Sequence, residues 1–236
     1  NKGVQGSDLA TVENMTSVLV HRGPDSQGLL HDSSVALGNT RLSIIDTSHN
    51  GDLPMSTSDG SVWLCYNGEI SNFRELRTKY ELDKKFDFIS TSDSEVLLYL
   101  YKLLGISFLD ELSGMFAFCL YDRTEQTVYL VRDFYGILPL FVHQTSEGVY
   151  FSSEIKSFLE IPSFEKRVDK ESIHHFFSLA YIPGSRTPFE SIQEVQGGEL
   201  IKIRRDQEPE FRTYYKLDYK EDHSIDKKTA VETTRE

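Results

Sequence analysis

The stretch MFAFCLY at residues 115–121 is an unbroken run of apolar and aromatic residues, with the length and composition of a buried β-strand. Outward from it, similar blocks occur at 128–131, 138–143 and 149–152, and short polar segments separate them. Connections this short leave no room for crossover helices. We therefore predict an antiparallel meander between Met115 and Tyr150 and exclude a purely parallel sheet.

Strand-like blocks outnumber helical ones along the rest of the chain, and several are continuously apolar, as in a sheet covered on both faces. The pattern predicts an α+β fold in which two antiparallel sheets pack together with helices outside. Ser92 and Glu95 form a capping-box pattern that opens a helix, and Gly105 ends it. The other expected strands are 35–46, 62–66 and 199–203, and the other expected helices are 9–20, one from Ser71 or Asn72, and 170–179.

Composition narrows the class of protein. The 236 residues carry a formal net charge of −12, which argues against binding to nucleic acid or to anionic lipid. The most apolar stretch, 96–118, is interrupted by charged residues, so it cannot provide the roughly 18 apolar residues that a membrane span needs. The N-terminus lacks the basic, then apolar, then small-residue segments of a secretory signal. Two cysteines cannot form a disulfide framework. We expect a cytoplasmic protein.

Several kinds of active site are not indicated by the sequence. It contains no glycine-rich phosphate-binding loop and no His-Glu-x-x-His motif. His174 and His175 are adjacent on an expected helix, where side chains point about 100° apart, so they make a poor metal pair. Cys65 and Cys119 lie in apolar strands and are interpreted as small buried residues, since a papain-like thiol needs an exposed polar pocket. We expect no metal and no cofactor in this chain.

Polar residues at the ends of predicted elements are the candidates for function. Arg41 follows a strand block, Asn67-Gly68-Glu69 ends another, and Asp93 lies at the start of a helix. Each has a structural explanation when taken alone. Arg41 suits a surface ion pair, Asn67-Gly68 a turn, and Asp93 an acid at the positive end of a helix dipole.

Together, these residues belong to seven blocks that occur in the order seen in asparagine synthetases. The blocks are HRGPD (21–25), RLSIID (41–46), NGEI (67–70), DSEV (93–96), GMFAF (114–118), RDFYGILPL (132–140) and SSEIK (152–156). The chain resembles their N-terminal glutaminase domain, a class II glutamine amidotransferase, over about residues 9–204. The resemblance implies the four-layer fold of the N-terminal-nucleophile hydrolases, with two antiparallel sheets between helical layers.

The resemblance also implies hydrolysis of glutamine to glutamate and ammonia, with a role for each candidate. Arg41 matches the position that holds the α-carboxylate, where a guanidinium makes charge-assisted hydrogen bonds. Asp93 and Glu69 match the positions that meet the α-ammonium group. The Asn67 side chain and the Gly68 backbone N–H match the oxyanion hole. Backbone groups near Ile44 and Ile45 complete the pocket, whereas the blocks containing Arg132-Asp133 and His21-Arg22 are interpreted as structural.

The nucleophile is where the sequence departs from the family pattern. In the family it is an N-terminal cysteine whose own α-amino group is the base, because an amine with a pKa near 7.7–8.0 suits proton transfer at neutral pH. Residue 1 here is Asn, and neither Cys65 nor Cys119 matches that position. We expect a short nucleophile-bearing strand before Asn1. Without it, the 236 residues should be inactive.

The resemblance divides the chain into an amidotransferase domain at 1–204 and a charged linker at 205–236. The linker would lead to a C-terminal ATP-pyrophosphatase domain that amidates aspartate, so ATP and Mg would belong to that domain. Two alternatives stay open: an inactive glutamine-binding module on the same fold, and a glutaminase that feeds a related synthetase with another acid acceptor. The oligomeric state is also open, with a homodimer as one option.

Overall fold

The computed structural model describes residues 4–219, 221 and 224–235. Its strands are β1 (Ser26–His31), β2 (Ala36–Arg41), β3 (Met55–Ser56), β4 (Val62–Ile70), β5 (Gly114–Asp122), β6 (Thr127–Arg132), β7 (Phe141–Gln144), β8 (Val149–Ser152), β9 (Ile192–Glu194), β10 (Glu199–Arg204) and β11 (Glu210–Thr213). Its helices are α1 (Gly6–Ser17), α2 (Phe73–Lys79), α3 (Leu82–Lys85), α4 (Asp93–Leu104), α5 (Lys170–Leu179) and α6 (Lys227–Arg235), with short 3₁₀ helices η1 (Val20–Arg22), η2 (His49–Gly51), η3 (Gly105–Glu111) and η4 (Ile155–Glu160).

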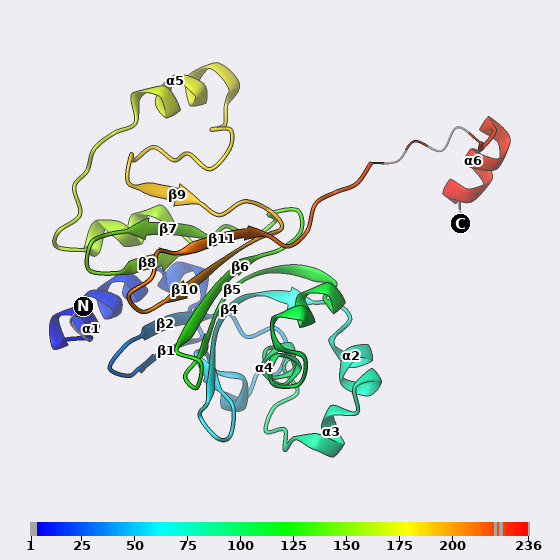
Figure 1. The fold of residues 1–236 in the computed structure, drawn as a ribbon, viewed down its shortest axis with the longest axis horizontal. Coiled ribbons are helices and arrows are strands. Elements are labelled where there is room, and N and C mark those ends of the chain that lie inside the picture. The colour runs from blue at the N-terminus through cyan, green and yellow to red at the C-terminus, as the bar shows by residue number, and fades with distance from the viewer. Residues whose placement is uncertain (1–3, 220, 222–223, 236) are drawn as a thin grey trace.

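A six-stranded antiparallel sheet in the order β11-β10-β6-β5-β4-β3 forms the centre of the molecule (Figure 1). The predicted strand 115–121 lies within β5, which pairs with β4 along its whole length and places Cys65 opposite Cys119. Because both faces of β4 and β5 are covered, both strands are apolar at consecutive positions instead of alternating. The expected antiparallel core is confirmed.

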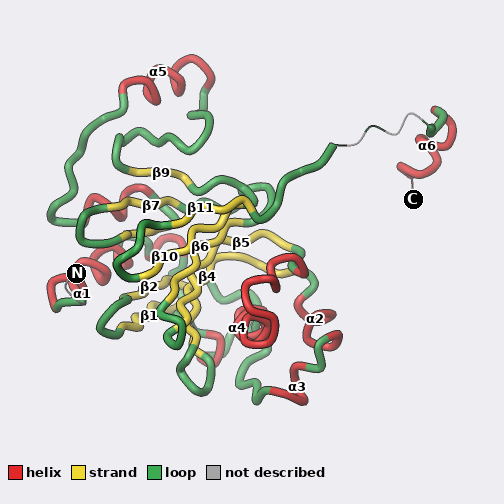
Figure 2. The backbone as a smooth tube through the Cα atoms, in the orientation of Figure 1, coloured by secondary structure: helices red, strands yellow, loops and turns green. Residues whose placement is uncertain are grey.

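Four layers are stacked on one another, as expected from the α+β prediction. Helices α2–α4 cover one face of the six-stranded sheet, and the short sheets β1-β2 and β8-β7-β9 cover the other (Figures 1 and 2). Helix α1 and η4 form the outermost layer beyond the short sheets. Apolar side chains fill the spaces between the layers, with Leu97 and Phe118 in the first, Leu37 and Cys119 in the second, and Met15 and Phe158 in the third.

The second sheet layer is divided. Among the described residues, β2 pairs with no strand other than β1, apart from an isolated bridge between Arg41 and Pro24, and β8 pairs only with β7. The expectation of two whole sheets therefore holds for the architecture, but the second layer consists of two separately hydrogen-bonded parts. The free backbone edges of β2 and β8 border a common cavity, described below.

The expected meander over 115–150 is wrong beyond β6, because the chain changes layer there. The carboxylate of Asp133 is fully buried and accepts hydrogen bonds from the backbone N–H groups of Phe116, Tyr135, Ile137 and Leu138. Arg132 donates to the carbonyl groups of Leu138, Gly136 and Val195. These bonds satisfy the buried polar groups of a loop that redirects the chain into β7. The structural interpretation of Arg132 and Asp133 agrees with this geometry.

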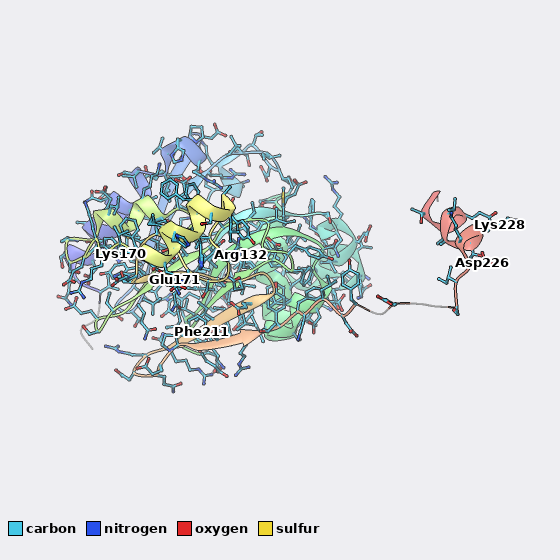
Figure 3. The ribbon with its side chains drawn as sticks, turned by 90° about the horizontal axis from the view of Figure 1, so that it is seen from above. Arg132, Lys170, Glu171, Phe211, Asp226 and Lys228 are labelled. Atoms are coloured by element: carbon cyan, nitrogen blue, oxygen red, sulfur yellow. The ribbon has the colours of Figure 1, made fainter. Side chains whose placement is uncertain are left out.

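The expected domain boundary at 204 lies inside the fold. Residues 205–209 form the turn of a hairpin, because β11 returns along β10 and extends the central sheet. Tyr214 then donates a hydrogen bond from its hydroxyl to the carbonyl of Arg132 at 2.6 Å. The charged composition of 205–210 is that of an exposed turn and edge strand, and it resembled a linker for that reason. Figure 3 labels Phe211 on the edge strand β11.

Helix α6 lies apart from the layered body in both views, and Asp226 and Lys228 mark it in Figure 3. No helix in the described part of the chain combines the length and apolar character that a bilayer crossing requires.

Candidate functional site

One cavity of about 1440 Å³ brings together every residue that the sequence indicated for function. Three chain segments supply them: the end of β2 with the loop after it, the end of β4, and the first residue of α4. The residues are Arg41, Ile44, Ile45, Asn67, Gly68, Glu69 and Asp93.

Strand β2 stops at Arg41, so the predicted strand 35–46 is too long. The strand ends there because the loop that follows it folds around the buried guanidinium of Arg41. Its Nη1 donates to the Ser48 carbonyl and to Asp52 Oδ1, both at 3.1 Å. Its Nη2 donates to the carbonyls of Ile45, at 3.1 Å, and Asp46. Arg41 therefore shapes the loop that presents Leu42, Ile44 and Ile45 to the cavity, and its contact with a substrate carboxylate stays a prediction.

Asp93 is 4% exposed and lies at the N-terminus of α4. Its Oδ2 accepts hydrogen bonds from the Tyr66 hydroxyl at 2.7 Å and from the Ile70 backbone at 2.9 Å, and its Oδ1 accepts from the Ser94 backbone at 3.0 Å. Within the described ranges, no ion pair reaches this carboxylate. A buried carboxylate held by neutral donors at a cavity wall is suited to a cationic ligand.

The N-terminus of α4 differs in detail from the predicted capping box. Ser92 is the N-cap and accepts from the Ser94 backbone at 3.2 Å, as expected. Glu95 does not reach back to Ser92 but accepts from the backbone of Ile89 at 3.0 Å and of Ser90 at 2.8 Å. This keeps the segment 89–92 packed against the helix, which fixes where Asp93 enters the cavity.

Asn67 presents a buried side-chain amide without a hydrogen-bond partner. Its Nδ2 is one of three buried side-chain polar atoms in the described structure that have none. Leaving such a donor unpaired costs about 1–3 kcal/mol, so buried polar groups are nearly always satisfied. A donor of this kind at a cavity wall is free for a ligand oxygen.

Gly68 follows Asn67 where β4 lies against β5. A Cβ at this position would come within 2.5 Å of the Met115 carbonyl oxygen and 2.9 Å of the Phe116 Cα, so no larger residue fits. Glu69 is exposed at the rim of the same cavity. The end of β4 thus sets an amide donor, a glycine backbone and a carboxylate in succession along the cavity.

The cavity continues from these residues into a slot between β2 and β8. Alternate residues of β5, namely Ala117, Cys119 and Tyr121, line it together with Cys65 of β4. The hairpin turns at 144–148 and 204–209 line it further along. The two strands that flank the slot are the ones with free edges, so the slot offers backbone donors and acceptors on both sides.

Neither cysteine has the environment of a nucleophile. Burial raises the pKa of the Cys65 thiol to about 12 and that of Cys119 well above its ordinary value. The Cys65 thiol also donates to the Gly38 carbonyl at 3.2 Å. Thiols with raised pKa values in apolar surroundings are unreactive.

We predict that iodoacetamide at mildly alkaline pH leaves both thiols of the native protein unlabelled, because the reactive thiolate forms only when the sheet opens. Peptide mass spectrometry should find Cys65 and Cys119 labelled in denaturant and unlabelled in the native protein over the same time. Fast labelling of native Cys65 would contradict the buried placement.

Tyr66 lines the cavity and Asp46 directly follows the lining residue Ile45, although sequence reasoning missed both. Tyr66 directly precedes Asn67 and holds Asp93 through its hydroxyl. Asp46 ends the block RLSIID and bonds to Thr91, far away in the sequence. In the sequence, only their position beside predicted site residues indicated them.

Among the described residues, no group of three or more histidine, cysteine or acidic side chains is arranged to hold a metal ion.

Comparison with protein families gives one match that spans nearly all of the layered body. Residues 2–215 match the model described as a glutamine amidotransferase domain. The match ends just after β11, at the point where the structure also leaves the central sheet.

Curated relatives cover most of this chain. Asparagine synthetase [glutamine-hydrolyzing] 1 of Bacillus subtilis is 38% identical over 209 residues, which are 89% of this chain and 33% of that protein. Amidase chyE of Penicillium rubens is 33% identical over 224 residues, which are 94% of this chain and 32% of that protein. The chain therefore spans about a third of the length of these relatives.

Among solved structures, glutamine phosphoribosylpyrophosphate amidotransferase from B. subtilis matches with a TM-score of 0.55 and 22% identity. The match covers 76% of this chain and 35% of that one. At this identity the likeness concerns the fold alone, and it agrees with the expected α+β fold of antiparallel sheets between helical layers.

Proposed function

The chain belongs to the glutamine amidotransferase domain family, and on this premise we propose that its cavity binds glutamine and hydrolyses the side-chain amide to glutamate and ammonia. The observation that carries the proposal is the unpaired Nδ2 of Asn67. When a nucleophile adds to the amide carbon, the carbonyl oxygen becomes negative. The Asn67 amide and the Gly68 backbone N–H stabilise that oxygen, and the folded strand β4 orients both donors in advance.

The polar groups of the substrate find complementary partners along the cavity. The Asp93 carboxylate accepts hydrogen bonds from the α-ammonium group, and Glu69 adds negative charge at the rim of the cavity. Arg41 and the backbone of Ile44 and Ile45 face the α-carboxylate. Because glutamine carries three polar ends, a site that pairs all of them has a higher kcat/KM for glutamine than for amides that lack one.

In this proposal, the slot between β2 and β8 holds the segment that carries the nucleophile. An extended segment placed there pairs with both free edges and joins β1-β2 to β8-β7-β9 as one sheet. Its first residue, a cysteine, lies at the Asn67 end. Its thiol attacks the amide carbon, the carbon–nitrogen bond breaks, and ammonia leaves with the proton that the α-amino group took from the thiol. Water then hydrolyses the thioester to glutamate and restores the thiol.

The longer relatives suggest which domain would use the ammonia. We propose that a synthetase domain of the same polypeptide consumes it, with ATP and Mg, to amidate aspartate. The name of the Bacillus relative supports this acceptor. The Penicillium relative is named an amidase, and its name gives no acid acceptor, so the acceptor must be tested separately.

The deciding experiment is N-terminal sequencing and intact-mass measurement of the protein made from its complete reading frame, combined with an assay of glutamate release. We expect a cysteine at the mature N-terminus and glutamate release that ends when the cysteine is alkylated. Retained binding of glutamine, without a nucleophilic first residue and without glutamate release, would replace the enzyme by a glutamine-binding module.

A further inference from the structure

Asp46 joins two separate walls of the cavity. It lies in the loop after β2, whereas Thr91 lies in the segment that leads into α4. Asp46 Oδ2 accepts a hydrogen bond from the Thr91 backbone N–H at 2.7 Å. Its Oδ1 accepts from the Ser48 backbone at 3.0 Å and from the Ser48 hydroxyl at 2.5 Å. Hydrogen bonds from Ser48 and Thr91 lower the pKa of Asp46 to about 2, so the carboxylate is charged at neutral pH.

The backbone of Asp46 takes part in the same connection. Its carbonyl accepts from the guanidinium of Arg41, and its φ of 54° is in the left-handed region, which aspartate adopts more readily than most residues. A continuous path therefore runs from Arg41 through Asp46 to Thr91, which lies two positions before Asp93. One end of this path is Arg41, which is assigned to the α-carboxylate of glutamine, and the other end lies two positions before Asp93, which is assigned to the α-ammonium group.

We propose that Asp46 is a positioning residue that sets the spacing between the carboxylate-binding and ammonium-binding walls, and so determines glutamine affinity without touching the substrate. This rests on the proposed glutaminase function. A single carbon atom joins the two charged groups of an amino acid, so their partners must be held at one separation. The charge-assisted bond from Thr91 to Asp46 holds that separation, while the oxyanion donors on β4 are independent of it.

The test compares Asp46→Gly and Asp46→Asn with the wild type in the full-length protein. Glycine adopts the left-handed conformation freely, so Asp46→Gly removes the carboxylate without straining the backbone. We expect the KM for glutamine to rise about tenfold, as for loss of hydrogen bonds to a charged group, with kcat within about twofold. Asparagine keeps one acceptor without the charge, so the KM of Asp46→Asn should lie between those of the wild type and Asp46→Gly.

A second substrate separates positioning from general damage. Glutaramate is glutamine without the α-ammonium group, so it does not depend on the spacing between the walls. Its kcat/KM should be the same in wild type and in Asp46→Gly, and an equal loss for both substrates would overturn the proposal. The matched control is Glu81→Gly, which removes another left-handed acidic residue outside the cavity. The Glu81 carboxylate accepts a hydrogen bond from Lys84, three positions along the chain, so its loss should leave every constant unchanged.

Failure of this inference is distinct from failure of the proposed function. If the wild type releases glutamate and Asp46→Gly has an unchanged KM, the positioning role is wrong and the function stands. If the wild type binds glutamine in calorimetry without releasing glutamate, the function is wrong, and a tenfold weaker Kd of Asp46→Gly still supports the positioning role. If the wild type does not bind glutamine at all, both are overturned.

Discussion

Replacing Asn67 with alanine should lower kcat for glutamine hydrolysis by about 10²–10³-fold while KM changes by no more than a few-fold. The unpaired Nδ2 has no structural bond to lose, so its removal affects the developing oxyanion and not the fold. Measuring initial rates of glutamate release across glutamine concentrations in the full-length protein separates the two constants. The melting temperature should stay close to that of the wild type.

Asn72→Ala is the matched control for Asn67→Ala. The Asn72 side chain donates to the Glu111 carbonyl at 2.9 Å, and Asn72 does not line the cavity. Its Oδ1 also accepts from the Ser113 backbone at 3.0 Å, so Asn72→Ala should lower stability through two lost bonds and leave kcat unchanged. A kcat for Asn67→Ala equal to that of the wild type would remove Asn67 from the oxyanion hole.

Asp93→Asn should raise the KM for glutamine by about 10–100-fold, because the α-ammonium group loses its buried countercharge. The shapes of the two side chains are nearly the same, so the bond from the Tyr66 hydroxyl can persist. We expect a smaller effect on kcat, since Asn67 and Gly68 lie on a different element. Steady-state kinetics and calorimetric titration with glutamine should agree on the loss.

Glu95→Gln provides the comparison for Asp93→Asn. Glu95 is also a buried carboxylate in the first turn of α4, but its partners are Ile89 and Ser90, and it does not line the cavity. This variant should be less stable and keep the wild-type KM. Equal KM values for Asp93→Asn and the wild type would show that the ammonium group binds elsewhere.

Elements with a strong local signal were predictable from the sequence. The helix expected over 170–179 is α5 with the same bounds, and the helix from Ser92 to Gly105 is α4 with its N-cap and stop residue as expected. The apolar block 115–121 lies in the middle of the central sheet. Apolar periodicity, capping residues and glycine act within a few positions along the chain, so they can be recognised without knowledge of the fold.

Features that depend on distant contacts were not predictable. The crossing from β6 to β7 depends on Asp133 bonding to four backbone groups in a buried loop, and the composition of that loop does not differ from a simple turn. The hairpin of β10 and β11 carries charged residues because it lies at a sheet edge, so it was interpreted as a linker. In both cases the same local composition is compatible with two folds.

The sequence by itself determined the fold class, the central strands and, through ordered motif blocks, seven candidate residues that are all among those lining the cavity. Only the tertiary structure decided that β2 and β8 present free edges, that Asn67 has an unpaired amide, and that Asp46 links Arg41 to the approach of Asp93. The physical reason is separation along the chain. Tyr66 lies 27 positions from Asp93, and Asp46 lies 45 positions from Thr91, so these bonds exist only after the layers have packed.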